Sequence, residues 1–105
     1  MADTRDPADD LRSLGGIDRI VHEPARLMVL MHLYAVQEAD YTFLMNATAL
    51  TWGNLSSHLS TLEGAGYVEV IKGYVGKKPH TLVRLTPEGR RAVDDYRRTM
   101  RSALR

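Results

Sequence analysis

Hydrophobic residues along the chain recur mostly at helical spacing, separated by short polar or glycine-containing segments. Apolar side chains at three- and four-residue intervals predict a short amphipathic helix from residue 11, interrupted or ended near Gly15 and Gly16. Pro24 suits the first turn of a second helix that runs to about Gln37. This helix is apolar on nearly every side, which predicts burial all round, either at the centre of the domain or between two chains.

Two further helices are predicted in the middle of the chain. Residues 42–49 form a short one, and Thr51 is a natural N-cap for another over about residues 52–64. At about 100° per residue, the leucines of this second helix share one side, which we expect to be buried. The buried stripe consists of Leu55, Leu59 and Leu62, and the outward face of Gly53, Asn54, Ser57, Ser60 and Thr61, with His58 at its flank.

The remaining pattern predicts two strands and a final helix. Residues 67–72 and 80–85 are rich in β-branched and aromatic residues, and the segment 73–79 between them reads as a hairpin loop with two glycines and two adjacent lysines. Thr86 is then a capping hydroxyl, followed by proline and an acid in the first turn of a helix.

This order of helix, helix, tight turn, helix and two-stranded hairpin is the winged helix-turn-helix arrangement, a mostly helical α+β fold. The helix over about 52–64 would enter the major groove of DNA, where base edges carry a distinguishable code. The wing at 73–79 would place Lys77 and Lys78 on the flanking backbone or in the minor groove.

Three segments resemble bacterial regulators of the MarR/ArsR type. Residues 50–59 (LTWGNLSSHL) and 62–68 (LEGAGYV) are similar to the recognition helix, 72–81 (KGYVGKKPHT) to the wing, and 85–90 (LTPEGR) to the start of the final helix. The resemblance covers roughly residues 23–100. It implies a homodimeric transcriptional regulator, which we expect to be a repressor, on a palindromic operator with one recognition helix per half-site. It also implies DNA-facing positions for Trp52, Asn54, Ser57 and His58, with Lys77 and Lys78 at the wing tip.

The charge pattern limits how such a helix could read DNA. The chain has 14 Lys and Arg against 13 Asp and Glu, and none of its basic residues lies between Arg26 and Lys72. A helix without arginine cannot make the bidentate guanine contact, although Asn54 could read adenine. Affinity would then depend on Lys72, Lys77, Lys78 and Arg84. The alternative is a winged-helix module that binds another protein and has no specific DNA binding.

The terminal segments are predicted to pair two chains. The final helix carries an apolar stripe of Val93, Tyr96, Met100 and Leu104, and a domain of this size has too small a body to bury it together with the N-terminal helix. Pairing with a second chain, joined by Leu11, Leu14 and Ile17, is the simplest solution, and packing on the chain's own core is the alternative. We expect a flexible acidic N-terminus over residues 1–10 and a single domain over 11–105 that includes these dimerisation helices.

The sequence gives little support for a metal site or a catalytic site. The absence of cysteine excludes thiolate zinc sites, Fe–S clusters and cysteine nucleophiles, and the four histidines lack close metal-ligand spacing. Ser57 and His58 are helix neighbours that point about 100° apart, so they cannot form a nucleophile–base pair. We therefore expect no enzyme activity and no cofactor.

No apolar run approaches the roughly 18 residues needed to span a membrane, and we expect a cytoplasmic protein. A small lipophilic effector could enter between the helices near Tyr34, Tyr41 and Trp52.

Overall fold

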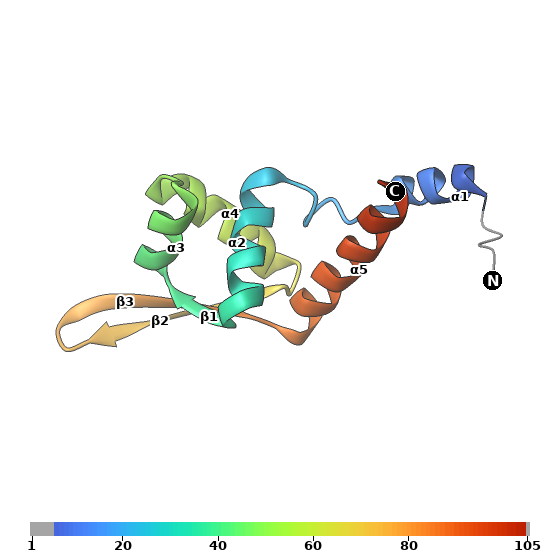
Figure 1. Ribbon diagram of the computed structural model, residues 1–105. Coiled ribbons are helices and arrows are strands. Elements are labelled where there is room, and N and C mark those ends of the chain that lie inside the picture. The colour runs from blue at the N-terminus through green and yellow to red at the C-terminus, as the bar shows by residue number, and fades with distance from the viewer. Residues whose placement is uncertain (1–5, 105) are drawn as a thin grey trace.

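The computed structural model describes residues 6–104, in which a helical body carries a small sheet on one side and a helical arm at one end (Figure 1). The elements are α1 (Pro7–Arg12), a 3₁₀ turn (Ser13–Gly16), α2 (Pro24–Val36), β1 (Glu38–Asp40), α3 (Tyr41–Thr48), α4 (Trp52–Gly64), β2 (Val68–Val75), β3 (Lys78–Leu85) and α5 (Pro87–Ala103). This is the mostly helical α+β winged helix that the sequence predicts.

Polar side chains fix the start of each helix of the body and of α5. The Glu23 carboxylate accepts hydrogen bonds from the first backbone amides of α2, and Asp40 accepts one at the start of α3. Thr51 Oγ1 accepts from the Asn54 amide at 3.2 Å, and Thr86 Oγ1 accepts from the Gly89 amide at 3.0 Å. These caps satisfy amides that have no partner within the helix, which confirms the starts predicted at Thr51 and Thr86.

The core lies where α2, α3 and α4 meet the sheet and the first half of α5. Leu55, Leu59 and Leu62 are at most 3% exposed, so the predicted buried stripe of α4 is confirmed. The other large side chains with less than 2% exposure come from the remaining elements and from the segment before α2, and they are Val21, Val29, Leu30, Leu33, Leu44, Val83, Leu85 and Val93.

The prediction that α2 is buried all round is wrong for the single chain. Met28, Met31 and Val36 are 40%, 38% and 50% exposed, since only one side of the helix packs on the core. Phe43 of α3 is also exposed, and its ring meets His32 of α2 edge to face. An apolar surface therefore extends over α2 and α3.

The wing is longer, and its loop shorter, than predicted. β2 and β3 pair antiparallel from Val68 opposite Leu85 to Val75 opposite Lys78, which leaves a two-residue turn at Gly76 and Lys77. Residues 73–75 and 78–79 are therefore strand, and the loop predicted over 73–79 is wrong at both ends. Gly76 has a φ of 63°, and a glycine with positive φ at the first turn position matches the twist of a tight hairpin.

Two further elements differ from the predictions. β1 was not predicted, and it adds a third strand to the sheet, in the order β1-β3-β2, with Glu38 opposite Arg84. α1 begins at Pro7, before residue 11, because the Asp6 carboxylate caps it by accepting from the Ala8 amide. The flexible N-terminus predicted for residues 1–10 lies partly outside the described residues and stays a prediction.

Candidate nucleic-acid interface

α4 turns a polar face to solvent, on the side of the helix away from the core. Asn54 and Ser57 are exposed, and Thr61 is half-buried with its hydroxyl donating to the Ser57 carbonyl at 3.3 Å. Glu63 is the single charged residue of this helix, histidine aside. Short, uncharged side chains let a helix approach a groove floor closely, and the exposed side-chain amide of Asn54 carries both donor and acceptor atoms.

Trp52 occupies the first turn of α4 and is 63% exposed. One face of its ring packs on Tyr41 of α3, with ring centroids 4.3 Å apart. The Tyr41 hydroxyl donates to the Trp52 carbonyl at 2.5 Å, and burial raises the pKa of Tyr41, which keeps that donor protonated. The aromatic pair thus fixes the start of α4 and leaves much of the indole open to solvent.

His58 lies at the edge of the polar face of α4, and its ring contacts the start of α2. Its Nδ1 lies 3.6 Å from Glu23 Oε2 and 3.3 Å from Arg26 Nη1, both at the start of α2, and its side chain is only 24% exposed. The Arg26 guanidinium also donates from Nε to the Ile20 carbonyl at 2.7 Å. His58 therefore joins α4 to α2 at the flank of the polar face, and its predicted contact with DNA stays a prediction.

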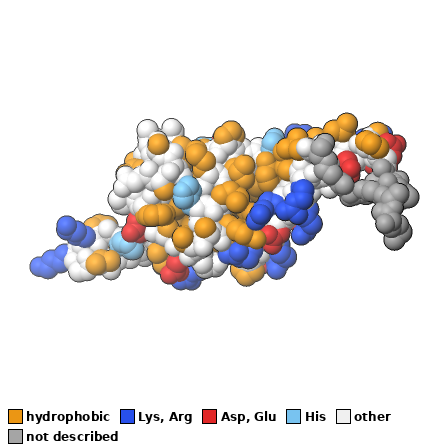
Figure 2. Space-filling view, in the orientation of Figure 1, with side chains coloured by type: hydrophobic (Ala, Val, Ile, Leu, Met, Phe, Trp, Pro, Cys, Tyr) orange, Lys and Arg blue, Asp and Glu red, His pale blue; other side chains and the backbone are white. Residues whose placement is uncertain are grey.

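The basic residues of the wing fall into two groups. Lys77 and Lys78 are exposed at the tip, and Figure 2 shows basic side chains at that outer end of the molecule. Lys72 is exposed further back on β2. Arg84, in contrast, is paired on the sheet with Glu38 of β1, with Nε 2.9 Å from Oε2. The three lysines are thus the exposed basic groups of the wing, whereas Arg84 is paired within its own sheet.

A pocket of about 200 Å³ lies between α4 and the base of the wing. Tyr41 and the apolar side chains of Leu59 and Val70 contribute to its wall. Its polar lining comes from Trp52, Ser56, Ser60 and Glu63 of α4 and from Lys72 and Thr81 of the wing. The sequence analysis missed Ser56 and Thr81, although the spacing of Trp52, Ser56 and Ser60 by four residues would have placed these three on one side of the helix.

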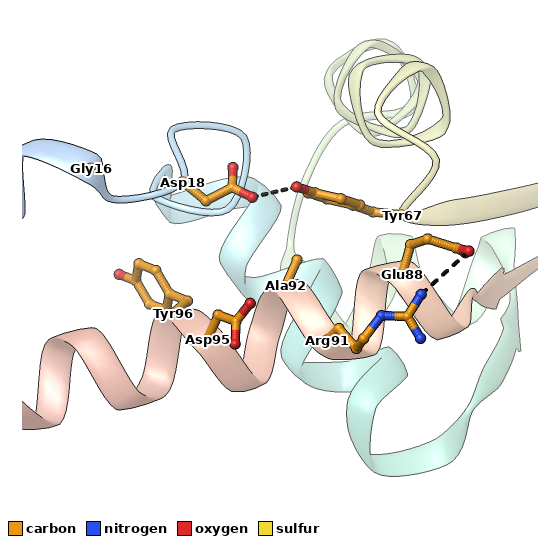
Figure 3. A pocket seen from close by; sticks show the side chains of 8 residues that line it. All are labelled: Gly16, Asp18, Tyr67, Glu88, Arg91, Ala92, Asp95 and Tyr96. Atoms are coloured by element: carbon orange, nitrogen blue, oxygen red, sulfur yellow. Dashed lines mark hydrogen bonds and ion pairs between the residues drawn. The ribbon is translucent and has the colours of Figure 1, made fainter.

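A second pocket, of about 340 Å³, separates the segment before α2 from α5 (Figure 3). The polar side chains that line it are paired: the Tyr67 hydroxyl donates to Asp18, Arg91 lies 3.5 Å from Glu88, and Asp95 pairs with Arg98. The hydrogen bond to Asp18, together with burial, raises the pKa of Tyr67 to about 12. This pocket therefore lies where the segment after the 3₁₀ turn packs beside α5.

The aromatic residues expected around a lipophilic effector do not come together. Tyr34 donates to Asp94 of α5 at 2.6 Å and has the guanidinium groups of Arg90 and Arg97 at 4.5 and 5.5 Å from its ring centre. Tyr41 and Trp52 instead pack on each other at the start of α4. The prediction of one site lined by all three side chains is wrong.

The terminal helices expose part of the stripe predicted for dimerisation. Leu11 and Leu104 are 58% and 72% exposed, whereas Leu14, Ile17, Tyr96 and Met100 are half-buried. Val93 has no exposed surface because it belongs to the core of its own chain, so its assignment to a dimer interface is corrected.

Within residues 6–104, no helix is both long and apolar enough to cross a membrane. The same residues contain no cluster of three or more histidine, cysteine or acidic side chains that could hold a metal ion.

Comparison with known proteins identifies the class of molecule. The model of the winged helix DNA-binding domain family matches residues 25–104, and the chain belongs to that family. A curated relative, the uncharacterized protein MJ0432 of Methanocaldococcus jannaschii, is 32% identical over 78 residues, which cover 74% of this chain and 85% of the relative.

Two solved structures have the same fold as this chain. A transcriptional regulator homologue from Pyrococcus horikoshii OT3 superimposes with a TM-score of 0.82 and 25% identity, over 91% of this chain and 94% of that one. A MarR-family regulator from Silicibacter pomeroyi gives a TM-score of 0.64 and 21% identity, over 93% of this chain and 63% of that one, and shows a shared fold. The resemblance to small MarR/ArsR-like regulators is therefore confirmed, and the family and fold are those of DNA-binding transcriptional regulators and not of enzymes.

Proposed function

We propose that the protein is a homodimeric, sequence-specific regulator that represses transcription by occupying an operator. The observation that carries this proposal is that the exposed polar face of α4 and the lysine-tipped wing belong to one body with the order of a winged helix-turn-helix. α4 would enter the major groove, and the wing would contact the flanking backbone or the minor groove. A repressor results when the operator overlaps the DNA that the polymerase must occupy.

The composition of α4 defines the kind of operator. Without arginine, this helix cannot make the bidentate contact to guanine, whereas the exposed amide of Asn54 can pair with the N6 and N7 atoms of adenine. The hydroxyl of Ser57 can bind either a base edge or a phosphate. We therefore expect each half-site to contain an adenine read by Asn54.

The test is fluorescence anisotropy with the DNA upstream of the protein's own gene and with a scrambled duplex, at about 50 and 200 mM salt. The proposal predicts tighter binding to the upstream DNA that persists at the higher salt, because base contacts are less sensitive to salt than phosphate contacts. Equal binding to both duplexes that disappears at about 200 mM salt would contradict it for this DNA, and the same assay on fragments of the whole genome then decides whether any operator exists.

A pair of variants separates base reading from general binding. Asn54→Ala should change which bases are preferred at one position of each half-site, with a loss of about tenfold for the best operator, since one base contact is worth roughly 1–3 kcal/mol. Asn46→Ala, an exposed asparagine of α3, is the matched control and should leave the preference unchanged. If Asn54→Ala binds the same selected sequences as the wild type, α4 does not read bases through this residue.

The neutral surface of α4 also favours one alternative, a module that binds another protein and has lost specific DNA binding. It would show only weak association with DNA, erased by salt, and would bind a protein partner through the same face. The genome-wide assay distinguishes the two functions, because selection of a defined operator excludes the alternative.

A further inference from the structure

The pocket between α4 and the base of the wing combines groups that suit a phosphate. Lys72 and Thr81 stand opposite each other in the pairing of β2 with β3, so their side chains lie on the same face of the sheet. Ser56 and Ser60 approach the same pocket from successive turns of α4. The pocket therefore brings an ammonium group and hydroxyl donors from two elements toward one volume of about 200 Å³.

The cationic group of this pocket is available. Lys72 is exposed, and no ion pair to it is found among residues 6–104. Glu63 is the one acidic residue that lines the pocket, and its Oε2 accepts a hydrogen bond from the Val70 amide of β2 at 3.2 Å. That contact joins α4 to the wing and so holds the two sides of the pocket together, while the Glu63 charge opposes an anion.

The geometry of B-DNA says which anion would arrive there. A major groove and its neighbouring minor groove are separated by one sugar–phosphate strand. If α4 occupies the first groove and the wing tip the second, this strand has to cross the molecule between α4 and the wing. The pocket would then lie at that crossing, with the exposed indole of Trp52 in its wall.

We propose that this pocket seats the DNA strand between the two grooves, with one phosphate bound by Lys72 Nζ and the hydroxyls of Ser56 and Thr81, and with the Trp52 ring against the adjoining deoxyribose. The inference rests on the proposed function, since it places a strand of the operator that α4 and the wing bind. It assigns to Lys72 a role different from that of the tip lysines: Lys72 fixes the register of the strand, whereas Lys77 and Lys78 contact DNA further along the wing.

The experiment uses the full-length protein and the operator identified by the anisotropy assay above. Single phosphates of that operator are replaced by neutral methylphosphonates. In the wild type, one replacement per half-site at the boundary between the grooves should weaken binding about tenfold, the size expected for removing a hydrogen bond to a charged group. In Lys72→Met the same replacement should have a clearly smaller effect, because only the hydroxyls still bind this phosphate, while replacements elsewhere act as in the wild type. Lys77→Met is the matched control and should lose sensitivity at a different phosphate.

Two further variants test the rest of the pocket. The double variant Ser56→Ala, Thr81→Val keeps Lys72 and should show a smaller effect of that methylphosphonate than the wild type, with circular dichroism used to check that the variant folds. Glu63→Gln keeps an acceptor for the Val70 amide and removes the opposing charge, so it should bind the operator several-fold more tightly.

The outcomes separate the inference from the function on which it rests. If the operator is bound specifically but Lys72→Met remains as sensitive as the wild type at every phosphate, the pocket does not hold a phosphate and the inference is wrong, while the proposed function stands. Unchanged or weaker binding by Glu63→Gln would likewise argue against an anion beside this carboxylate. If no operator is selected at all, the proposed function itself fails.

Discussion

At the scale of the residue, Gly89 shows how closely α5 approaches the chain before β2. A Cβ atom at this position would lie 2.1 Å from the Tyr67 carbonyl oxygen and 2.8 Å from Leu85 Cδ1. The carbonyl belongs to the backbone and cannot turn aside. Gly89→Ala should therefore lower the free energy of unfolding by about 3 kcal/mol, the upper part of the range for overpacked cores.

Urea denaturation measures this change. Gly53→Ala in α4 is the control, because a Cβ there meets nothing within 4 Å and alanine favours a helix by roughly 0.5–1 kcal/mol over glycine. Gly53→Ala should therefore be as stable as the wild type or slightly more stable. If Gly89→Ala also keeps the wild-type free energy of unfolding, α5 can move away from Tyr67 at little cost.

The pair of Tyr67 and Asp18 makes stability depend on alkaline pH. The pKa of Tyr67 is raised to about 12 in the folded protein, against about 10 in an unfolded chain. Between these values the folded state holds a proton that the unfolded state has lost, so the free energy of unfolding falls as pH rises from about 10 to 12. The contribution is complete below about pH 10.

Tyr67→Phe removes both the hydroxyl and this dependence. We expect a lower midpoint of thermal unfolding at pH 8 and a shallower decline between pH 10 and 12 than in the wild type. Tyr74→Phe, on the exposed wing, should keep the wild-type decline. An equally steep decline in Tyr67→Phe would mean that another group controls the alkaline unfolding.

Local pattern is a good guide to burial and capping but not to the partners of polar side chains. Leu55, Leu59 and Leu62 follow from the period of the helix, and the caps at Thr51 and Thr86 follow from residue type. His58 contacts Arg26, 32 positions away, and Arg84 pairs with Glu38, 46 positions away. Only the tertiary fold brings these groups together, so the sequence alone could not show that both are engaged.

At the scale of the element, the wing shows why glycine and proline mark a loop only roughly. Gly73, Gly76 and Pro79 all suggest a turn, yet a positive φ is needed only at Gly76. Gly73 opposite His80 and Tyr74 opposite Pro79 extend the ladder instead. β1 could not be predicted from local pattern because it has only three residues. It is a strand because it pairs with β3, which only the tertiary fold brings beside it.

The longer wing carries its lysines well beyond α4, and this leads to a prediction about binding strength. The double variant Lys77→Ala, Lys78→Ala should weaken binding to all DNA sequences alike and reduce the slope of log affinity against log salt by about one for each phosphate that is no longer bound. Anisotropy titrations at several salt concentrations measure the slope. A double variant with an unchanged slope would show that the tip does not touch the backbone.

At the scale of the whole molecule, the surface proposed to bind DNA and the surface proposed to pair two copies lie at opposite ends. The described residues extend over 61 × 24 × 22 Å, with the wing at one end and α1 with the end of α5 at the other (Figure 1). The arm formed by α1 and the second half of α5 adds little to the core. α1 has no buried residue, and the buried positions of α5 all lie in its first half. Leucines exposed in this way are the surface through which we propose that two copies pair.

The corresponding variant is Leu11→Lys with Leu104→Lys. Both side chains are largely exposed in the single chain, so the fold should survive, but two cations would enter an apolar contact between copies. Light scattering after size-exclusion chromatography should then give the mass of one chain where the wild type gives two. Phe43→Lys, an exposed apolar position on α3, should leave the wild-type mass unchanged.

The same variant connects assembly to function. A two-fold dimer binds two half-sites about 34–36 Å apart, and linking them raises affinity by roughly 10²–10⁴ over one half-site alone. The monomeric variant should therefore lose about that factor on the full operator while binding an isolated half-site as the wild type does. If its mass and its operator affinity both equal those of the wild type, the two copies do not meet through these leucines, and the exposed apolar face of α2 becomes the next surface to test.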